Sequence, residues 1–252
     1  MKTFVAPMQG HTEAIYCRSH SRIYNGADFY CTPFIRVEKG QVRARDLRAI
    51  RPELLGEAVV VPQAIFRDID EWRLITEAVA GLGHCRLDLN LGCPFPPQVK
   101  HGRGAALLRN PELLEAVGEE MRNYPQLSFS VKMRIGIEQP GEWRNVIDRI
   151  NALPVSHVTV HPRVAAQQYG GPLHMDEFHA LVSELSHPVV YNGDIMTPSD
   201  IDRMAALCPG LHGIMAGRGV MARPSLFAEW AQGREWTRDE RLSALMRLHD
   251  MI

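Results

Sequence analysis

The sequence predicts an α/β protein built as a (β/α)8 TIM barrel and followed by the start of a C-terminal helical domain. Short β-rich apolar runs and helical patterns alternate along the 252 residues until eight strands are accounted for. The runs stay apolar up to their last residues, which is typical of parallel strands covered by helices. A doubly wound sheet is the competing architecture, but the stretch Ala6-Pro7-Met8-Gln9-Gly10 lacks its Gly-rich fingerprint. Barrels of this class typically have about 250 residues.

The expected strands are apolar runs rich in β-branched residues and bounded by Gly, Pro or polar residues. They are Thr3–Met8, Asp28–Pro33, Ala58–Ile65, Cys85–Leu91, Ser128–Arg134, His157–His161, Pro188–Asn192 and Leu211–Ala216.

Apolar residues recur at helical spacing between these runs. Asn110 and Thr197 are capping residues that precede a proline at the first helical position. The connection over residues 36–55 has the weakest helical pattern, so we expect an extended loop there. The expected helices are Thr12–Tyr24, Asp68–Leu82, Pro111–Tyr124, Gly141–Leu153, Met175–Leu185, Pro198–Leu207 and Arg223–Ala231.

The last residues have a different pattern. Thr237 and Glu240 have the spacing of a capping box, and apolar residues follow at helical intervals. A single amphipathic helix cannot bury its own apolar face. We therefore expect residues 1–235 to form the catalytic barrel domain and residues 236–252 to be the first helix of a truncated helical domain.

Composition and charge exclude several classes of protein. Lys and Arg number 28 against 29 Asp and Glu, so the net charge of −1 excludes a strongly basic nucleic-acid coat but not a local basic patch. The 45% hydrophobic and 23% charged residues exclude disordered and collagen-like chains. No apolar run approaches the ~20 residues of a membrane span, and the N-terminal run is too short for a signal peptide.

The five cysteines are widely spaced and form no CxxC pair. This pattern argues against a disulfide framework or a metal site and suits a reducing cytoplasm. A lone cysteine is usually a small buried hydrophobic residue, which is our expectation for Cys17, Cys31, Cys85 and Cys208. Cys93 differs, because it stands between Gly92 and Pro94 directly after a strand and is predicted to be a functional thiol.

Polar residues gather at the C-terminal ends of the expected strands, where barrel enzymes carry their active sites. A purely structural barrel does not need Lys, His and Arg there, so the pattern predicts a polar ligand pocket. A surface ion pair for Lys132 and a satisfied core group for His161 are the alternatives. The residues at these ends are Met8, Gln9, Gln63, Asn90, Cys93, Lys132, Arg134, His161, Arg163, Asn192, Asp194, Gly217 and Arg218.

Two glycine-containing turns follow the seventh and eighth strands. These are Asn192-Gly193-Asp194 and Gly217-Arg218-Gly219. Barrels often bind a phosphate group there through freed backbone amides and a cation. Together the two turns predict a phosphate site.

The sequence resembles the dihydrouridine synthases, flavoprotein oxidoreductases of tRNA processing that modify a uridine of tRNA. The resemblance covers nearly the whole chain, and Asn90-Leu91-Gly92-Cys93-Pro94 is its most specific part. The matching segments are Ala6–Met8, Leu89–Pro94, Lys100–Gly104, Val131–Gly136, His161–Arg163, Gln168–Gly171, Asn192–Asp194 and Ala216–Gly219.

The resemblance implies a mechanism and a set of roles. In that family the cysteine, here Cys93, donates a proton to carbon 5 of uracil while reduced FMN delivers hydride to carbon 6, and NADPH then reduces the flavin. FMN would be held by Pro7, Met8, Gln63, Lys132, His161, Asn192, Gly193, Asp194, Gly217 and Arg218. The uridine of tRNA would be bound by Asn90, Lys100, Arg134 and Arg163.

The acid role has a physical requirement. A thiol near its ordinary pKa of ~8.5 stays protonated at neutral pH, as an acid must be. We therefore predict that the pKa of Cys93 is not strongly depressed.

Two departures from the family pattern affect these expectations. Pro162 replaces a small residue between His161 and Arg163. The family's helical tRNA-binding domain is represented only by residues 236–252, so we expect FMN binding but weak tRNA binding. The protein is expected to be a monomer that binds no membrane.

Two other functions stay open at this point. One is an FMN-dependent barrel oxidoreductase acting on a small molecule, and the other is an inactive RNA-binding homologue. The residues do not identify the modified uridine, and they leave NADH and another RNA substrate possible.

Overall fold

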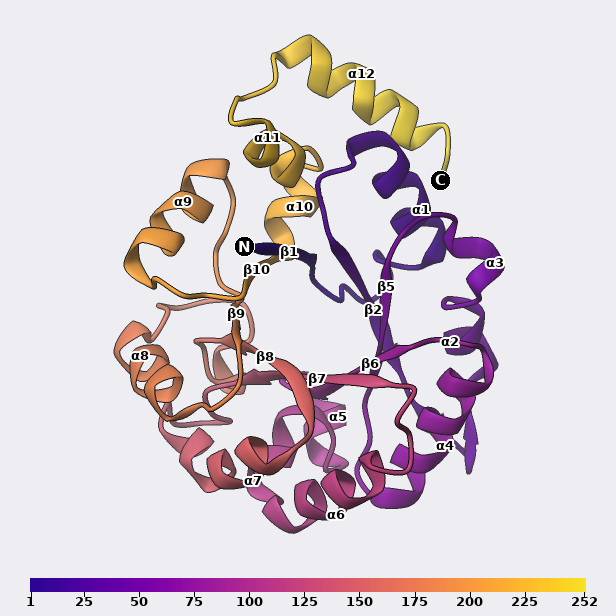
Figure 1. Ribbon diagram of the computed structural model, residues 1–252, viewed down its shortest axis with the longest axis vertical. Coiled ribbons are helices and arrows are strands. Elements are labelled where there is room, and N and C mark those ends of the chain that lie inside the picture. Colours follow the sequence, from indigo (N-terminus) through magenta and orange to yellow (C-terminus); the bar gives the residue numbers. More distant parts are fainter.

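The computed structural model, which describes residues 1–252, is a closed barrel of eight parallel strands (Figure 1). The barrel confirms the predicted fold class. Around it the strand order is β1-β10-β9-β8-β7-β6-β5-β2. The strands are β1 (Lys2–Val5), β2 (Phe29–Ile35), β5 (Val60–Ala64), β6 (Arg86–Leu91), β7 (Ser128–Arg134), β8 (Val155–His161), β9 (Val189–Tyr191) and β10 (Gly213–Ala216).

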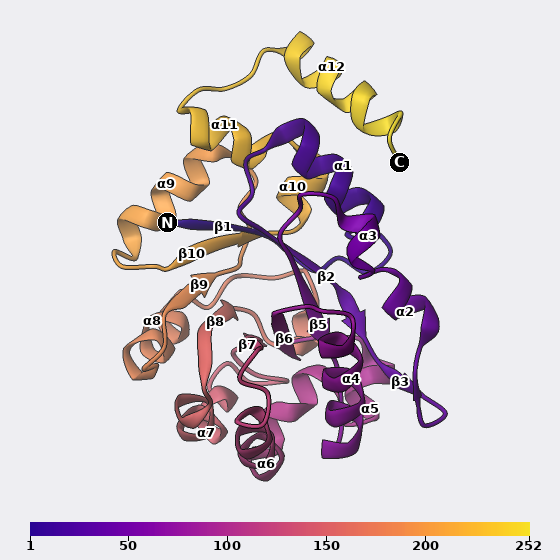
Figure 2. The ribbon, with the colours of Figure 1, turned by 45° about the vertical axis from the view of Figure 1, so that its right-hand side comes forward.

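Helices surround the barrel on its outside (Figure 2). Two of the predicted caps are present, because the side chain of Asn110 accepts a hydrogen bond from the Leu113 amide and that of Thr197 accepts one from the Asp200 amide. The helices are α1 (Ala14–Tyr24), α4 (Ile69–Gly81), α6 (Pro111–Met121), α7 (Ile147–Ala152), α8 (Met175–Glu184), α9 (Pro198–Leu207), α10 (Arg218–Ala222) and α11 (Leu226–Gln232).

Three local predictions need correction. Residues 36–55 contain a hairpin, β3 (Val37–Glu38) and β4 (Gln41–Val42), and two short helices, α2 (Ala44–Arg48) and α3 (Pro52–Leu55). The helix expected over residues 141–153 is divided into η2 (Glu142–Asn145) and α7, and the one expected over 223–231 begins only at Leu226.

The second strand also continues past its predicted end. It runs through Pro33 to Ile35, and its pairing with β5 shifts register between Cys31 and Phe34. Proline cannot donate to a strand ladder, so a register shift is where a strand tolerates it.

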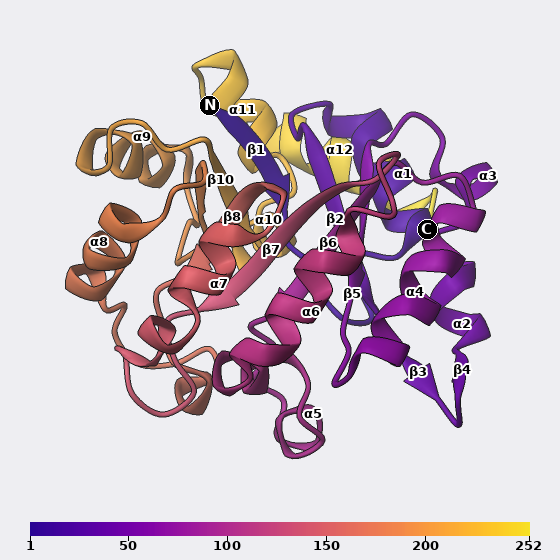
Figure 3. The same ribbon diagram turned by 60° about the horizontal axis from the view of Figure 1, so that its bottom comes forward.

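The loops at the carboxyl ends of β6 and β8 contain further short helices. These are α5 (Pro96–Lys100), η1 (Gly104–Arg109) and η3 (Ala165–Gln167). Figure 3 shows α5 and the β3–β4 hairpin along the lower edge of the molecule. This is the edge toward which the strands run.

The barrel interior has an apolar and a polar part. Phe4, Ala6, Cys31, Val61, Val190 and Met215 form one apolar cluster. Alternate residues of β6, β7 and β8 point to the same side of a strand, which places Asp88, Ser130 and Thr159 one level below the cavity-lining Asn90, Lys132 and His161. Buried polar groups require partners, and Asp88 and Ser130 are hydrogen-bonded to each other.

The last helix, α12 (Arg238–His249), lies outside the barrel against α1. Its predicted capping box is present, since Thr237 accepts a hydrogen bond from the Glu240 amide at 3.2 Å. Ala244 and Leu248 are buried near Tyr24, while other apolar side chains of the helix are exposed. None of the helices in the structure has the length and apolar character required to cross a membrane.

Candidate active site

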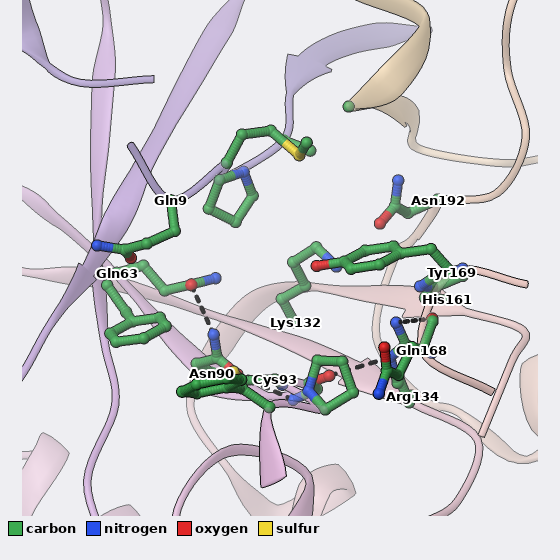
Figure 4. A pocket seen from close by; sticks show the side chains of 18 of the residues that line it. Gln9, Gln63, Asn90, Cys93, Lys132, Arg134, His161, Gln168, Tyr169 and Asn192 are labelled. Atoms are coloured by element: carbon green, nitrogen blue, oxygen red, sulfur yellow. Dashed lines mark hydrogen bonds between the residues drawn. The ribbon is translucent and has the colours of Figure 1, made fainter. Parts of the chain in front are cut away.

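A cavity of about 500 Å³ opens at the carboxyl ends of the strands, and all eight strands or their following loops contribute to its lining (Figure 4). This volume lies within the range of small-molecule sites, about 300–1,000 Å³. The predicted site residues in the lining are Pro7, Met8, Gln63, Asn90, Cys93, Lys132, Arg134, His161, Asn192, Gly193, Asp194, Gly217 and Arg218.

Hydrogen bonds on both sides of Cys93 hold its loop in place. The side-chain oxygen of Asn90 accepts from the amides of Gly92 at 3.0 Å and Cys93 at 2.7 Å. The carbonyl of Cys93 accepts from the Ala105 amide at 3.2 Å. Gly104 allows this contact, because a Cβ there would lie 2.8 Å from both the Cβ and the carbonyl oxygen of Cys93. The Lys100–Gly104 segment therefore packs directly against the thiol loop.

Burial raises the pKa of the Cys93 thiol, and an amide of Phe95 and the charges of Arg134 and Lys132 oppose that rise only in part. The prediction that this pKa is not depressed is confirmed. At neutral pH the side chain is a protonated thiol, the state from which a proton can be donated.

Two amide side chains link Cys93 to a buried acid. The amino group of Asn90 donates to the carbonyl of Gln63 at 2.7 Å (Figure 4). The amino group of Gln63 in turn donates to Asp88 at 2.7 Å, and the hydroxyl of Ser130 donates to the same carboxylate at 2.6 Å. Burial raises the pKa of Asp88 to about 6, so the group is mainly ionised at neutral pH.

Two cations from β7 face the cavity. Burial and the neighbouring Arg134 lower the pKa of Lys132 to about 8. Its ammonium has no ion-pair partner within 4.0 Å, so none of its three protons is committed to a carboxylate. The guanidinium of Arg134 instead donates to the carbonyls of Gly92, Val164 and Gln168 at 3.0, 2.9 and 2.5 Å.

His161 lies among these cations. Burial and the charges of Arg134 and Lys132 keep its pKa well below the ordinary value, so the imidazole is neutral at neutral pH. A neutral imidazole has one donor and one acceptor nitrogen for a ligand.

The ends of β9 and β10 form the predicted phosphate region. The amino group of Asn192 donates to the Met215 carbonyl at 2.9 Å and fixes the two loops together. A Cβ on Gly217 would lie 3.0 Å from the sulfur of Met8, so glycine permits this close approach. A second hollow of about 20 Å³ lies beside these loops, and Asn192, Asp194 and Arg218 line both spaces.

Two predicted site residues do not line the cavity. Arg163 is buried and donates to Asp194 at 2.6 and 2.8 Å and to the Gly171 carbonyl at 2.9 Å. Its expected place facing uracil is therefore corrected, because these partners hold it behind the wall. Lys100 is exposed in the last turn of α5 and also lies outside the cavity lining.

The prediction missed several lining residues. Tyr169 is 54% exposed, and its ring centroid lies 5.7 Å from the guanidinium carbon of Arg134 and 5.9 Å from that of Arg218. Its position within a segment shared with the dihydrouridine synthases was the available signal. Phe34 follows a proline at which the strand was expected to end, and Gln168 also lines the cavity. Gln9, predicted at the end of the first strand, lies in the lining as expected.

The other cysteines lie elsewhere. Cys17 and Cys31 are buried as expected, but Cys85 is exposed and Cys208 is half-buried, which corrects the expectation that both are core residues.

Comparison with known proteins identifies related chains. The family model described as "Dihydrouridine synthase (Dus)" matches residues 4–251. A protein of Pseudomonas putida named tRNA-dihydrouridine(16) synthase is 31% identical over 260 residues, which cover 100% of this chain and 79% of that protein. One of the same name from Aquipseudomonas alcaligenes is also 31% identical, covering 96% of this chain and 79% of its own length.

More distant similarities are also found. A human protein named tRNA-dihydrouridine(20a/20b) synthase [NAD(P)+]-like is 32% identical over 152 residues, or 58% of this chain and 46% of that protein. The solved structure of N-(5'-phosphoribosyl)anthranilate isomerase from Pyrococcus furiosus has a TM-score of 0.57 at 11% identity, with 92% of this chain and 97% of that chain covered. The latter supports the fold alone.

Proposed function

This chain belongs to the dihydrouridine synthase family, and we propose that it reduces the C5–C6 double bond of a uridine in tRNA, with FMN as its flavin and NADPH as the electron donor. The observation that carries the assignment of the site is the protonated thiol of Cys93 at the wall of the cavity, beside Lys132 and Arg134. Acting on a base in folded RNA requires its extrusion into such a pocket, at a cost of a few kcal/mol.

The residues of the cavity fit a flavin nucleotide. Pro7 and Met8 offer apolar contacts, while Gln63, Lys132 and His161 offer polar atoms on the facing strands. Lys132 is the most informative of them, because a half-buried ammonium that forms no ion pair within 4.0 Å favours a ligand that carries or develops negative charge. The fit rests on this set of donors together with the cavity volume.

The opposite end of the cavity suits the phosphate. Asn192, Gly193, Gly217 and Arg218 would hold it. Asp194 would act indirectly, because its carboxylate accepts from Arg163 and from Arg218 at 2.6 Å and so orients a cation for the anion. When bound, reduced FMN supplies the hydride for carbon 6.

Cys93 would donate the proton to carbon 5 of the uracil. Asn90 holds the thiol loop, and Lys132 supplies positive charge where the ring system becomes electron-rich. All three hydrogen bonds recorded for Arg134 go to carbonyls, so we propose that it assists uracil binding through its charge and by fixing the loop. Lys100, exposed at the end of α5, would contact the RNA backbone instead of the base.

We also propose the target position and the RNA-binding part. Position 16 is the first candidate, because relatives with 16 in their names match over nearly the whole chain. Residues 236–252 would belong to a helical tRNA-binding part and residues 1–235 to the catalytic barrel of a monomer. The exposed apolar residues of α12 support this division, and they are Leu242, Leu245 and Met246.

The two alternative functions are set aside. A small-molecule oxidoreductase does not explain relatives named tRNA-dihydrouridine synthases over this length. An inactive homologue does not explain a cysteine retained at the cavity wall with both backbone sides fixed.

The test is dihydrouridine formation in tRNA that lacks the modification. Wild-type protein with FMN and NADPH is expected to form it, Cys93→Ala is expected to lose at least about 100-fold in rate, as for a removed general acid, and the control Cys85→Ala is expected to be unchanged. Site mapping then compares position 16 with the others. An undiminished rate for Cys93→Ala, or a protein that takes up no flavin from solution, would overturn the proposal.

A further inference from the structure

We infer that Asp88 is a positioning residue for Cys93, acting through a directed chain of hydrogen bonds from the thiol loop to the barrel interior. The inference rests on the proposed function only for its catalytic consequence. The chain itself consists of Asp88, Gln63, Asn90 and the backbone of Cys93.

Each end of the chain has a fixed polarity. At the inner end an ionised carboxylate can only accept hydrogen bonds, and at the outer end the backbone amides of Gly92 and Cys93 can only donate. The two side-chain amides between these ends can each be reversed in principle. Only one arrangement satisfies both ends, namely amino group toward Asp88 for Gln63 and amino group toward Gln63 for Asn90.

Burial makes this arrangement consequential. Gln63 is 0% exposed, Asp88 2% and Asn90 7%, so water does not readily replace a lost partner. A break at Asp88 leaves the amino group of Gln63 without its acceptor. The side-chain amide of Gln63 can then rotate, so its carbonyl no longer reliably accepts from the amino group of Asn90. The hydrogen bond from the Cys93 backbone amide to the Asn90 side chain weakens as a result.

Ser130 provides a matched control. Its hydroxyl donates to the other oxygen of the same carboxylate at 2.6 Å, and it has no recorded contact with the thiol loop. Ser130→Ala therefore removes a buried hydrogen bond of Asp88 without interrupting the path to Cys93. A purely structural role for Asp88 predicts that loss of either bond has the same kind of effect.

The experiment measures the alkylation rate of Cys93 by iodoacetamide, read by mass spectrometry, in the FMN-loaded protein. Asp88→Leu is expected to speed alkylation about five- to tenfold, as loss of one buried hydrogen bond allows a loop to open more often. Ser130→Ala is expected to change the rate less than about twofold. Asp88→Asn, whose side-chain oxygen can still accept from Gln63, is expected to stay near wild type.

A double-mutant cycle tests the path itself. If Asp88 acts through Asn90, then Asn90→Ala alone already removes the influence of Asp88 on the Cys93 loop. The double variant Asn90→Ala with Asp88→Leu is therefore expected to be alkylated no faster than Asn90→Ala alone. The inference would be overturned if the rate increases of the two single variants multiplied in the double variant, or if Asp88→Leu were alkylated at the same rate as Ser130→Ala. If Asp88→Leu does not fold, Gln63→Leu breaks the chain at its next residue and carries the same expectation.

The alkylation readout is independent of turnover. Failure of the proposed function would appear as dihydrouridine formation without Cys93, whereas failure of this inference would appear as an unchanged thiol reactivity. If both hold, dihydrouridine formation is expected to fall in Asp88→Leu through kcat with little change in KM, and Asp88→Asn is expected to restore it.

Discussion

Replacing Lys132 by Met is expected to stabilise the flavin-free protein while it weakens FMN binding. The half-buried side chain ends in an ammonium that forms no ion pair. Desolvation together with Arg134 lowers its pKa from 10.5 to about 8, and the charge of Asp88 opposes that fall only in part. Methionine keeps most of the aliphatic length and removes the charge. Comparing the variant with wild type therefore measures how much the charge of Lys132 lowers the unfolding free energy.

The magnitude follows from the pKa of Lys132. The depression from 10.5 to about 8 corresponds to at most about 3 kcal/mol of unfolding free energy, because the side chain is only half-buried. Below about pH 8 both the folded and the unfolded chain carry the proton, so the full penalty is present. Between about pH 8 and 10.5 the unfolded chain holds more protons than the folded one, so stability rises with pH. Above that window the penalty is gone.

Urea denaturation at pH 7 and pH 10.5 checks this reasoning. At pH 7 we expect Lys132→Met to exceed wild type by up to about 3 kcal/mol, with the difference shrinking toward zero at high pH. The control Lys100→Met makes the same substitution at an exposed lysine and is expected to stay within about 0.5 kcal/mol. A Lys132→Met protein no more stable than wild type at pH 7, or a gap that does not depend on pH, would refute the argument.

Three further predictions concern the walls of the site. Gly104→Ala is expected to cost about 1–3 kcal/mol and most of the activity, whereas Gly102→Ala, also at positive φ but with nothing nearer than 3.8 Å, is expected to keep the activity. Arg163→Met is expected to cost about 2 kcal/mol in urea denaturation and to weaken FMN binding, because it removes buried hydrogen bonds to Asp194 and the Gly171 carbonyl while Arg218 still pairs with that carboxylate. At neutral pH, iodoacetamide is expected to alkylate Cys93 more slowly than exposed Cys85, and the Cys93 rate is expected to rise with pH because burial raises its pKa.

A specific result would contradict each of these three predictions. Equal activity in the two glycine variants would show that the thiol loop tolerates displacement. Unchanged FMN affinity in Arg163→Met would separate that ion pair from the phosphate region. Faster alkylation of Cys93 than of Cys85 at pH 7 would mean that the thiol is activated and unsuited to the acid role.

The sequence allowed the barrel to be predicted because its signals are local. Strands such as Ser128–Arg134 combine β-branched residues with a polar end, and the ladder at that end brings Asn90 beside Lys132 and Arg134 beside His161. Parallel strands in one barrel must place their carboxyl ends on one rim, so strand ends alone are enough to collect most of the cavity lining.

The remaining details depend on contacts between distant segments. By its place just after a strand, Arg163 was expected to face the ligand. It does not, because its guanidinium donates to the carboxylate of Asp194, 31 residues later, and to the carbonyl of Gly171. The hydrogen bonds of Gln63 with Asp88 and Asn90 span 25 and 27 residues. Residue type and spacing do not record which amide faces which partner, so a directed chain of this kind becomes visible only in three dimensions.

The cations at the cavity wall destabilise the ligand-free protein, and an anionic ligand is what would compensate for them. Lys132 and Arg134 lie at the wall with depressed pKa values, and burial together with their charges keeps His161 neutral. At neutral pH Lys132 and Arg134 keep their charges at a cost to the stability of the ligand-free chain, and an anionic ligand offsets that cost by interacting favourably with both cations. We therefore expect FMN to raise the thermal midpoint of wild type more than that of Lys132→Met. Equal increases at matched saturation would show that the Lys132 cation does not interact with the ligand.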